Sequence, residues 1–304
     1  MSYNKKIKYL EVNRSELKRF SYHDKTKKEL AVMMNEIIND QIHGISFSPY
    51  LEDQNPDLAS EISEDQIRDR LLIIKPHTKW IRTFSCTNGN EKTPKIAHEL
   101  GFKTLVGVWL GTDLDKNEEE LANAIEITKN GYVDILAIGN EVLLREDLSV
   151  EELINYIVRA KKELPGIKIG YADSYYTFSN YPEIADACDI ILANCYPFWE
   201  YCSLETSVDY IKHMYKLASS VSKGKQVIIS ETGWPSKGSK FGESVPSIKN
   251  AMDYFIQTFQ WTQSENIDIF YFSSFDEVWK AGHEGEYGAY WGIWDKDGKY
   301  KFNY

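Results

Sequence analysis

The 304-residue sequence lacks the residue spacings that most metal and nucleotide sites require. Its four cysteines and six histidines include no C-x-x-C or H-E-x-x-H spacing, so we expect no bound metal. No G-x-G-x-x-G or Walker pattern follows an apolar run, which argues against a nucleotide- or dinucleotide-binding fold. We therefore expect a protein that needs no cofactor.

Long apolar runs are also missing, because no segment approaches the 18 apolar residues of a membrane span. The positive charges of residues 1–20 have no apolar run behind them, so we expect no export signal in the chain as given. The cellular location, including secretion or a periplasmic site for a trimmed form, stays open. Three of the four cysteines fall on or beside apolar stretches, which favours small buried thiols over disulfides; the four are Cys86, Cys188, Cys195 and Cys202.

Positive charge is scarce: there are 35 Lys and Arg against 46 Asp and Glu, giving a formal net charge of -11 that would repel nucleic acid and anionic membranes.

Aromatic residues are plentiful, with eight Trp, 20 Tyr and 13 Phe. Aromatic faces stack on the apolar faces of sugar rings, although ordinary packing is the better interpretation of any single aromatic. We expect a monomer that binds a polysaccharide or oligosaccharide.

Short β-branched runs alternate with amphipathic helical patterns along most of the chain, and eight runs can be counted. Near-continuous apolar character is typical of buried parallel strands, and eight repeats favour a closed (β/α)8 barrel over an open sheet. The eight runs lie at residues 42–49, 80–85, 103–110, 133–140, 167–173, 189–197, 226–231 and 267–275. We predict a single catalytic TIM-barrel domain over residues 1–304, with residues 1–41 as an N-terminal extension.

Helical periodicity fills most gaps between these strands, at residues 64–74, 119–129, 150–164, 207–220 and 247–263. The 29 residues after Phe275 are rich in Gly, Asp and aromatics and show no amphipathic helix. Since the last strand of a barrel still needs cover, we predict that the helical segment 26–40 packs over the seam between strands eight and one.

Two of the predicted strands end in glutamate, at Glu141 on strand four and Glu231 on strand seven. Reacting groups of this barrel project from the carboxyl ends of its strands, so both side chains are expected at the mouth. A glutamate pair can flank a glycosidic bond, one carboxyl protonating the leaving oxygen and the other attacking carbon. Asn140 beside Glu141 is an amide placed for the sugar 2-hydroxyl, and Trp234 supplies an aromatic face after strand seven.

The motifs GNEVL at 139–143 and SETGWPS at 230–236 resemble the acid/base and nucleophile motifs of glycoside hydrolase family 17, a β-1,3-glucanase family. GISFSPY at 44–50, IRTFSC at 81–86, FDEVWK at 275–280 and YWGIWD at 290–295 extend the resemblance over residues 44–295. The resemblance is closer to bacterial and fungal members than to plant members.

The resemblance implies roles for individual residues. Glu141 matches the acid/base and Glu231 the nucleophile, while Glu277 and Lys280 match a charged pair whose ammonium would keep Glu231 ionised. A further family glutamate corresponds to either Glu284 or Glu286. The substrate-contacting candidates are Tyr50, Asn140 and Tyr196, with Phe198, Trp199, Trp234, Phe275, Trp279, Trp291 and Trp294 as aromatic candidates.

The implied reaction is a retaining double displacement on a laminarin-type β-1,3-glucan. Replacing water by a sugar in the second step would make the same site a β-1,3-glucan transglycosylase. A β-1,4- or mixed-linkage hydrolase would share the glutamate pair, and a non-catalytic glucan-binding barrel would not need it. The residues alone do not separate hydrolysis from transfer, or endo from exo action.

Overall fold

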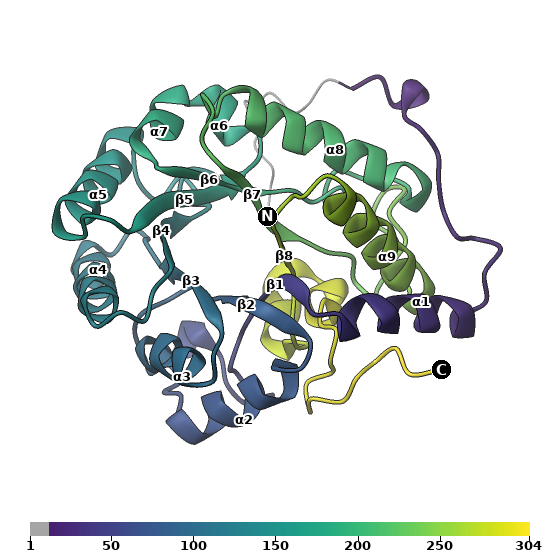
Figure 1. Ribbon diagram of the computed structural model, residues 1–304, viewed down its shortest axis with the longest axis horizontal. Helices are drawn as coiled ribbons and strands as arrows, with labels where there is room; N and C mark the ends of the chain where they lie inside the picture. Colours follow the sequence, from purple (N-terminus) through teal and green to yellow (C-terminus); the bar gives the residue numbers. More distant parts are fainter. Residues whose placement is uncertain (1–11) are drawn as a thin grey trace.

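The computed structural model describes residues 12–304, which form a closed barrel of eight parallel strands surrounded by helices (Figure 1). Each strand pairs with the next one in the chain, and the last pairs with the first. The strands are β1 (Ile42–Ser46), β2 (Thr78–Arg82), β3 (Lys103–Val108), β4 (Ile135–Asn140), β5 (Lys168–Ser174), β6 (Ile190–Asn194), β7 (Val227–Thr232) and β8 (Ile269–Tyr271).

Helices fill the connections between strands and form the outer layer of the molecule (Figure 1). The α-helices are α1 (Lys27–Asn39), α2 (Glu64–Ile74), α3 (Thr93–Glu99), α4 (Leu114–Lys129), α5 (Val150–Glu163), α6 (Thr177–Asn180), α7 (Pro182–Ala187), α8 (Leu204–Ser220), α9 (Ile248–Ser264) and α10 (Ala281–Glu284). Short 3-10 turns are η1 (Arg14–Glu16), η2 (Pro56–Leu58), η3 (Asn90–Lys92), η4 (Val278–Lys280) and η5 (Glu286–Tyr290).

The predicted (β/α)8 barrel is confirmed, with all eight strands in the expected order. Strand eight is shorter than the predicted 267–275, because the regular ladder is interrupted beyond Tyr271: Ser273 N–H donates to the Trp291 carbonyl, although Ser274 N–H still donates to Ser46 of β1. Four helices, α3, α6, α7 and α10, were not predicted; none exceeds seven residues, too few for apolar periodicity to show.

Apolar side chains form two layers, one inside the barrel and a larger one between strands and helices. Phe270 fills the inside of the barrel near its N-terminal end, and it fits because β1 carries glycine at position 44. A Cβ atom there would lie 2.5 Å from Phe270 Cδ1. The apolar lower barrel is the rigid base that fixes the strand ends at the mouth.

The predicted cover over the seam between β8 and β1 is helix α1, which packs against α9 and β1 (Figure 1). Its N-cap Thr26 forms a reciprocal capping box with Glu29. Leu30 and Met34, at most 1% exposed, belong to its apolar face. The C-terminal segment adds a hydrogen bond, since the Tyr300 hydroxyl donates to Asn35 Oδ1 over 2.6 Å.

The four cysteines are free and buried, as expected. Among residues 12–304, no helix combines the length and the apolar character that crossing a membrane requires. Of residues 1–20, where we expect no export signal, residues 1–11 lie outside the described part of the chain.

Candidate active site

Glu141 directly follows β4, where the pairing of β4 with β5 shifts register between Ala137 and Asn140. Its backbone is left-handed, with φ of 53°, and its N–H donates to the Ala172 carbonyl over 2.8 Å. Two residues later the Leu143 N–H donates to the Tyr171 hydroxyl over 2.9 Å. These bonds to β5 stabilise a turn that directs Glu141 into the mouth of the barrel.

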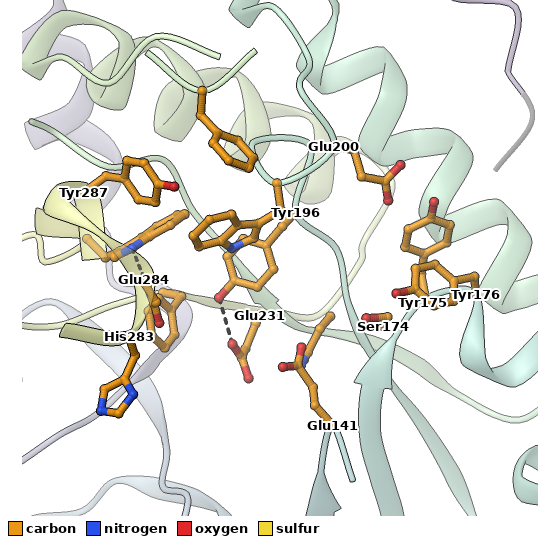
Figure 2. A pocket seen from close by; sticks show the side chains of 15 residues that line it. Glu141, Ser174, Tyr175, Tyr176, Tyr196, Glu200, Glu231, His283, Glu284 and Tyr287 are labelled. Atoms are coloured by element: carbon orange, nitrogen blue, oxygen red, sulfur yellow. Dashed lines mark hydrogen bonds between the residues drawn. The ribbon is translucent and has the colours of Figure 1, made fainter. Parts of the chain in front are cut away.

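Glu231 lies within β7 and is 6% exposed. One of its oxygens, Oε1, accepts a hydrogen bond from Arg82 Nη1 over 2.7 Å, and the other, Oε2, accepts one from the Tyr196 hydroxyl over 2.7 Å (Figure 2). Arg82 is 1% exposed, so this ion pair is buried. A guanidinium and a phenol on the two oxygens stabilise the ionised carboxylate.

Both glutamates line one pocket at the carboxyl ends of the strands. Figure 2 shows Glu231 and Tyr196 in the middle of this pocket. Glu141 and Glu200 lie on one side of them, together with Ser174, Tyr175 and Tyr176, and the opposite side is formed by His283, Glu284 and Tyr287. The pocket therefore extends away from the glutamate pair in two directions.

A polar network connects the two carboxyl groups beneath the pocket. Asn194 donates from Nδ2 to Glu141 Oε1 over 3.0 Å, while its Oδ1 accepts from the Ser230 hydroxyl over 2.8 Å. Arg82 donates from Nη2 to Asn140 Oδ1 over 2.7 Å, in addition to its bond to Glu231. Side chains from β2, β4, β6 and β7 thus hold one another in place around the barrel axis.

The two glutamates meet different electrostatic surroundings. Removal from water, with the neighbouring carboxyl groups of Glu231 and Asp173, raises the pKa of Glu141 to about 8. Burial and the adjacent Glu231 also raise the pKa of the Tyr196 phenol, which therefore stays a proton donor to that carboxylate. At neutral pH the pocket thus combines a protonated carboxyl group with an ion-paired carboxylate, the arrangement that acid–base and nucleophilic chemistry require.

A model of the BtgE/BtgC glycoside hydrolase domain matches residues 44–292 of this chain. The crystal structure of a glycoside hydrolase family 17 β-1,3-glucanosyltransferase from Rhizomucor miehei has 30% sequence identity and a TM-score of 0.77, covering 86% of this chain and 96% of that one. The chain belongs to glycoside hydrolase family 17. An active-site mutant of the same enzyme in complex with laminaritriose superposes with a TM-score of 0.78 at the same identity and coverage.

Among curated relatives of this family 17 enzyme is the glucan 1,3-β-glucosidase BGL2 of Candida albicans, 28% identical over 265 residues. That match covers 77% of this chain and 84% of the relative. A glucan 1,3-β-glucosidase of Arthroderma benhamiae is 29% identical over 254 residues, covering 76% of this chain and 81% of the relative. The similarity therefore extends over most of the barrel.

The expected charged pair of Glu277 and Lys280 is present: Lys280 Nζ pairs with Glu277 Oε2 at 2.6 Å and lies 4.0 Å from the centre of the Phe272 ring. The cation that pairs directly with Glu231 is Arg82, which was not predicted. Arg82 is the last residue of β2, and a charged side chain at a strand end is the sequence signal that could have identified it.

The structure separates the two candidates for the further family glutamate. Glu284 lines the pocket and accepts a hydrogen bond from Trp291 Nε1 over 3.2 Å, and burial raises its pKa to about 7. Glu286 is exposed and accepts from the Ser239 hydroxyl outside the pocket lining. Sequence spacing could not distinguish them, because the short helix α10 and the turn η5 decide which one faces inward.

Only some of the predicted aromatic contacts lie at the pocket: Tyr196, Trp199 and Trp291 line it. Trp279 lies next to the charged pair and donates to Glu277 over 3.1 Å. The other predicted aromatics are buried and do not line the pocket, and burial of their large apolar surface stabilises the loops. They are Tyr50, Phe198, Trp234, Phe275 and Trp294.

Several pocket residues were not predicted, and most of them lie on loops rather than at strand ends. Ser174 at the end of β5 and Asn194 at the end of β6 are the exceptions, and their positions on strand ends were the available signal. The remaining ones are Tyr175, Tyr176, Glu200, Phe241, Phe272, His283 and Tyr287. Within residues 12–304 no group of three or more His, Cys, Asp or Glu side chains forms a metal site.

Proposed function

We propose that this chain cleaves β-1,3-glucan, with Glu231 as nucleophile and Glu141 as general acid/base. The observation that supports this most strongly is the difference between the two carboxyl groups of one pocket: Glu231 is ion-paired with Arg82, and the pKa of Glu141 is about 8. The linkage is supported by the names of its relatives, which include glucan 1,3-β-glucosidases and a β-1,3-glucanosyltransferase.

In the first step a Glu231 oxygen attacks the anomeric carbon while the bond from that carbon to the leaving oxygen breaks. The Glu141 proton passes to the leaving oxygen, so the departing sugar is neutral and Glu141 becomes ionised. The product is a glycosyl ester of Glu231. Arg82 and Tyr196 hold the attacking carboxylate, and Asn140, whose Oδ1 is bound by Arg82, has its NH2 end left to meet the sugar 2-hydroxyl.

In the second step the Glu141 carboxylate removes a proton from water, and the water oxygen attacks the anomeric carbon. The ester bond breaks, Glu231 returns as a carboxylate and Glu141 is protonated again. Two inversions at one carbon give overall retention of configuration.

Transfer to a second sugar is the other candidate reaction, because the chain has 30% sequence identity to a β-1,3-glucanosyltransferase. The hydroxyl of an acceptor sugar would replace water and lose its proton to Glu141. Ser174, Tyr175 and Tyr176 line the pocket on the Glu141 side, where such an acceptor would bind (Figure 2). Products longer than the substrate, in digests of a defined laminari-oligosaccharide, would identify transfer.

The substrate assignment can be tested by comparing polysaccharides at equal mass concentration. We expect release of reducing sugar from laminarin at least about tenfold faster than from cellulose, xylan or starch, which is a difference of about 1.4 kcal/mol in transition-state binding. Equal or faster release from a β-1,4-glucan would contradict the linkage assignment and leave the proposed roles of the glutamates in place. The Glu231→Ala variant is the control for contaminating activity.

A further inference from the structure

Residues 12–26, here called the N-terminal arm, precede the family domain, whose match begins at residue 44. The arm passes along the outside of α8 and α9 before it enters α1 (Figure 1). Two of its backbone N–H groups bind α8: Lys18 N–H donates to Asp209 Oδ2 over 3.0 Å and Phe20 N–H to the Glu205 carbonyl over 2.7 Å. Leu17 is 6% exposed, so the arm is also anchored in the core.

Near the start of the arm, Arg14 binds the loop between β6 and α8. Its Nη2 donates to the Glu200 carbonyl over 2.6 Å and its Nη1 to the Tyr201 carbonyl over 3.5 Å. The guanidinium lies 5.5 Å from the centre of the Tyr210 ring, and the Tyr210 hydroxyl donates to the Glu200 carboxylate. One arginine of the arm thus binds the backbone of two consecutive loop residues.

The same loop is bound from its other side by Ser244, whose hydroxyl donates to the Phe198 and Cys202 carbonyls over 2.9 and 2.7 Å. Arg14 binds two of the three carbonyls that lie between these positions, those of Glu200 and Tyr201. The loop is thus held between the family domain on one side and the arm on the other.

This loop is a wall of the pocket, because Trp199 and Glu200 line it. Figure 2 places Glu200 on the same side of the pocket as Glu141. A general acid lies beside the leaving oxygen, so this side of the pocket receives the leaving-group sugars, and the acceptor sugars if transfer occurs. Arg14 therefore binds the backbone of Glu200, a residue that lines the side of the pocket where those sugars would lie.

We propose that Arg14 is a positioning residue that holds Glu200 in place for leaving-group and acceptor sugars. Because Arg14 is exposed and does not line the pocket, its loss should move the loop without unfolding the barrel. The proposal rests on the proposed function, since it concerns sugars bound at that same site.

The test compares Arg14→Ala with Arg19→Ala in the full chain. Arg19 is an exposed arginine of the same arm, so both variants lose the same charge. Two substrates are used: a linear laminari-oligosaccharide, and an aryl β-laminaribioside whose leaving group contains no sugar. For Arg14→Ala we expect KM for the oligosaccharide to rise several-fold, with kcat and KM for the aryl substrate and the melting temperature unchanged. Arg14→Lys should restore part of the affinity.

Equal kinetics of the Arg14→Ala and Arg19→Ala variants on the oligosaccharide would overturn the proposal. So would a parallel loss on both substrates, or a lowered melting temperature for Arg14→Ala alone, since either would indicate a structural role. If the wild-type protein cleaves neither substrate, the proposed function is overturned and the inference with it. If the wild type is active and Arg14→Ala has the same kinetics as Arg19→Ala, only the inference about Arg14 is overturned.

Discussion

Glu141 and Glu231 have the same side chain, and their neighbours alone decide which one binds a proton at neutral pH. Glu231 has the Arg82 guanidinium and the Tyr196 hydroxyl on its two oxygens. Glu141 has one amide donor, Asn194 Nδ2, and two further carboxyl groups near it, which together with burial raise its pKa to about 8. The proposed division of labour between acid and nucleophile follows from this difference.

Asp173 on β5 contributes to this difference from behind the pocket. It is fully buried, and its carboxylate accepts hydrogen bonds from the Ser174 N–H, the Thr177 hydroxyl and the Tyr171 hydroxyl. Burial raises the pKa of Asp173 to about 6, so it is already ionised at the pH where Glu141 loses its proton. Its charge therefore opposes ionisation of Glu141, as does Glu231, whereas Arg145 favours it.

We predict that Asp173→Asn moves the alkaline limit of activity to lower pH. A general acid must be protonated, so activity falls as pH rises through the pKa of Glu141; removing a nearby negative charge lowers that pKa. The measurement is a pH profile of kcat/KM on laminari-oligosaccharide. Asp186→Asn, which removes an exposed carboxylate that pairs with Lys223 outside the pocket lining, is the control, and we expect its alkaline limit to match the wild type. An unmoved limit in Asp173→Asn would contradict this account.

The residues that sequence patterns identify best are those on strand ends, where the barrel dictates the direction of the side chain. Glu141 and Glu231 were identified in this way and lie in one pocket. Arg82 was missed, because the predicted strand 80–85 runs past it, whereas β2 ends at Arg82 and buries its side chain. The large aromatics were only partly predictable, since a tryptophan before a glycine or proline suits a sugar platform and a packed loop equally.

At the scale of elements, the role of α1 follows from the absence of a long helix after β8. The C-terminal segment after β8 contains only α10 and two 3-10 turns, so it provides no long helix over the seam. The helical pattern of residues 26–40 was therefore assigned to that place, and α1 does pack there against α9 and β1. The remaining elements were less predictable where they are short: α6 and β8 have four and three residues.

We predict that Leu30→Ala in α1 lowers the free energy of unfolding by about 2–5 kcal/mol, as expected for a fully buried leucine. The loss reflects removed apolar burial and an unfilled cavity beside β1 and α9. Val32→Ala on the same helix is the matched control, because Val32 is 52% exposed; we expect a change within about 0.5 kcal/mol. Urea unfolding followed by circular dichroism measures both. Equal stability of the two variants would show that α1 does not cover the seam.

On the scale of the whole molecule, the barrel brings together side chains that are far apart in the sequence. Arg82, Asn140, Asn194 and Glu231 come from four strands and meet in one hydrogen-bond network. The repeat pattern of strands and helices predicts this convergence, because the carboxyl ends of parallel barrel strands share one face. The loops that complete the pocket walls were not predictable in detail, since their conformations depend on contacts such as those of Ser244 and Arg14.

The central claim is the assignment of roles to the two glutamates, and azide rescue tests it most directly. The Glu141→Ala variant keeps the nucleophile but lacks the acid, so cleavage of laminarin should fall by about 10²–10⁴-fold while an aryl β-glucoside with a good leaving group still forms the glycosyl ester. Azide in the space beside Ala then attacks that ester and gives a β-glucosyl azide. Glu231→Ala cannot form the ester, and azide displaces the leaving group directly to give the α-azide. Anomer analysis by proton NMR should give the β-azide from the variant at 141 and the α-azide from the variant at 231; the reverse result would contradict the assignment.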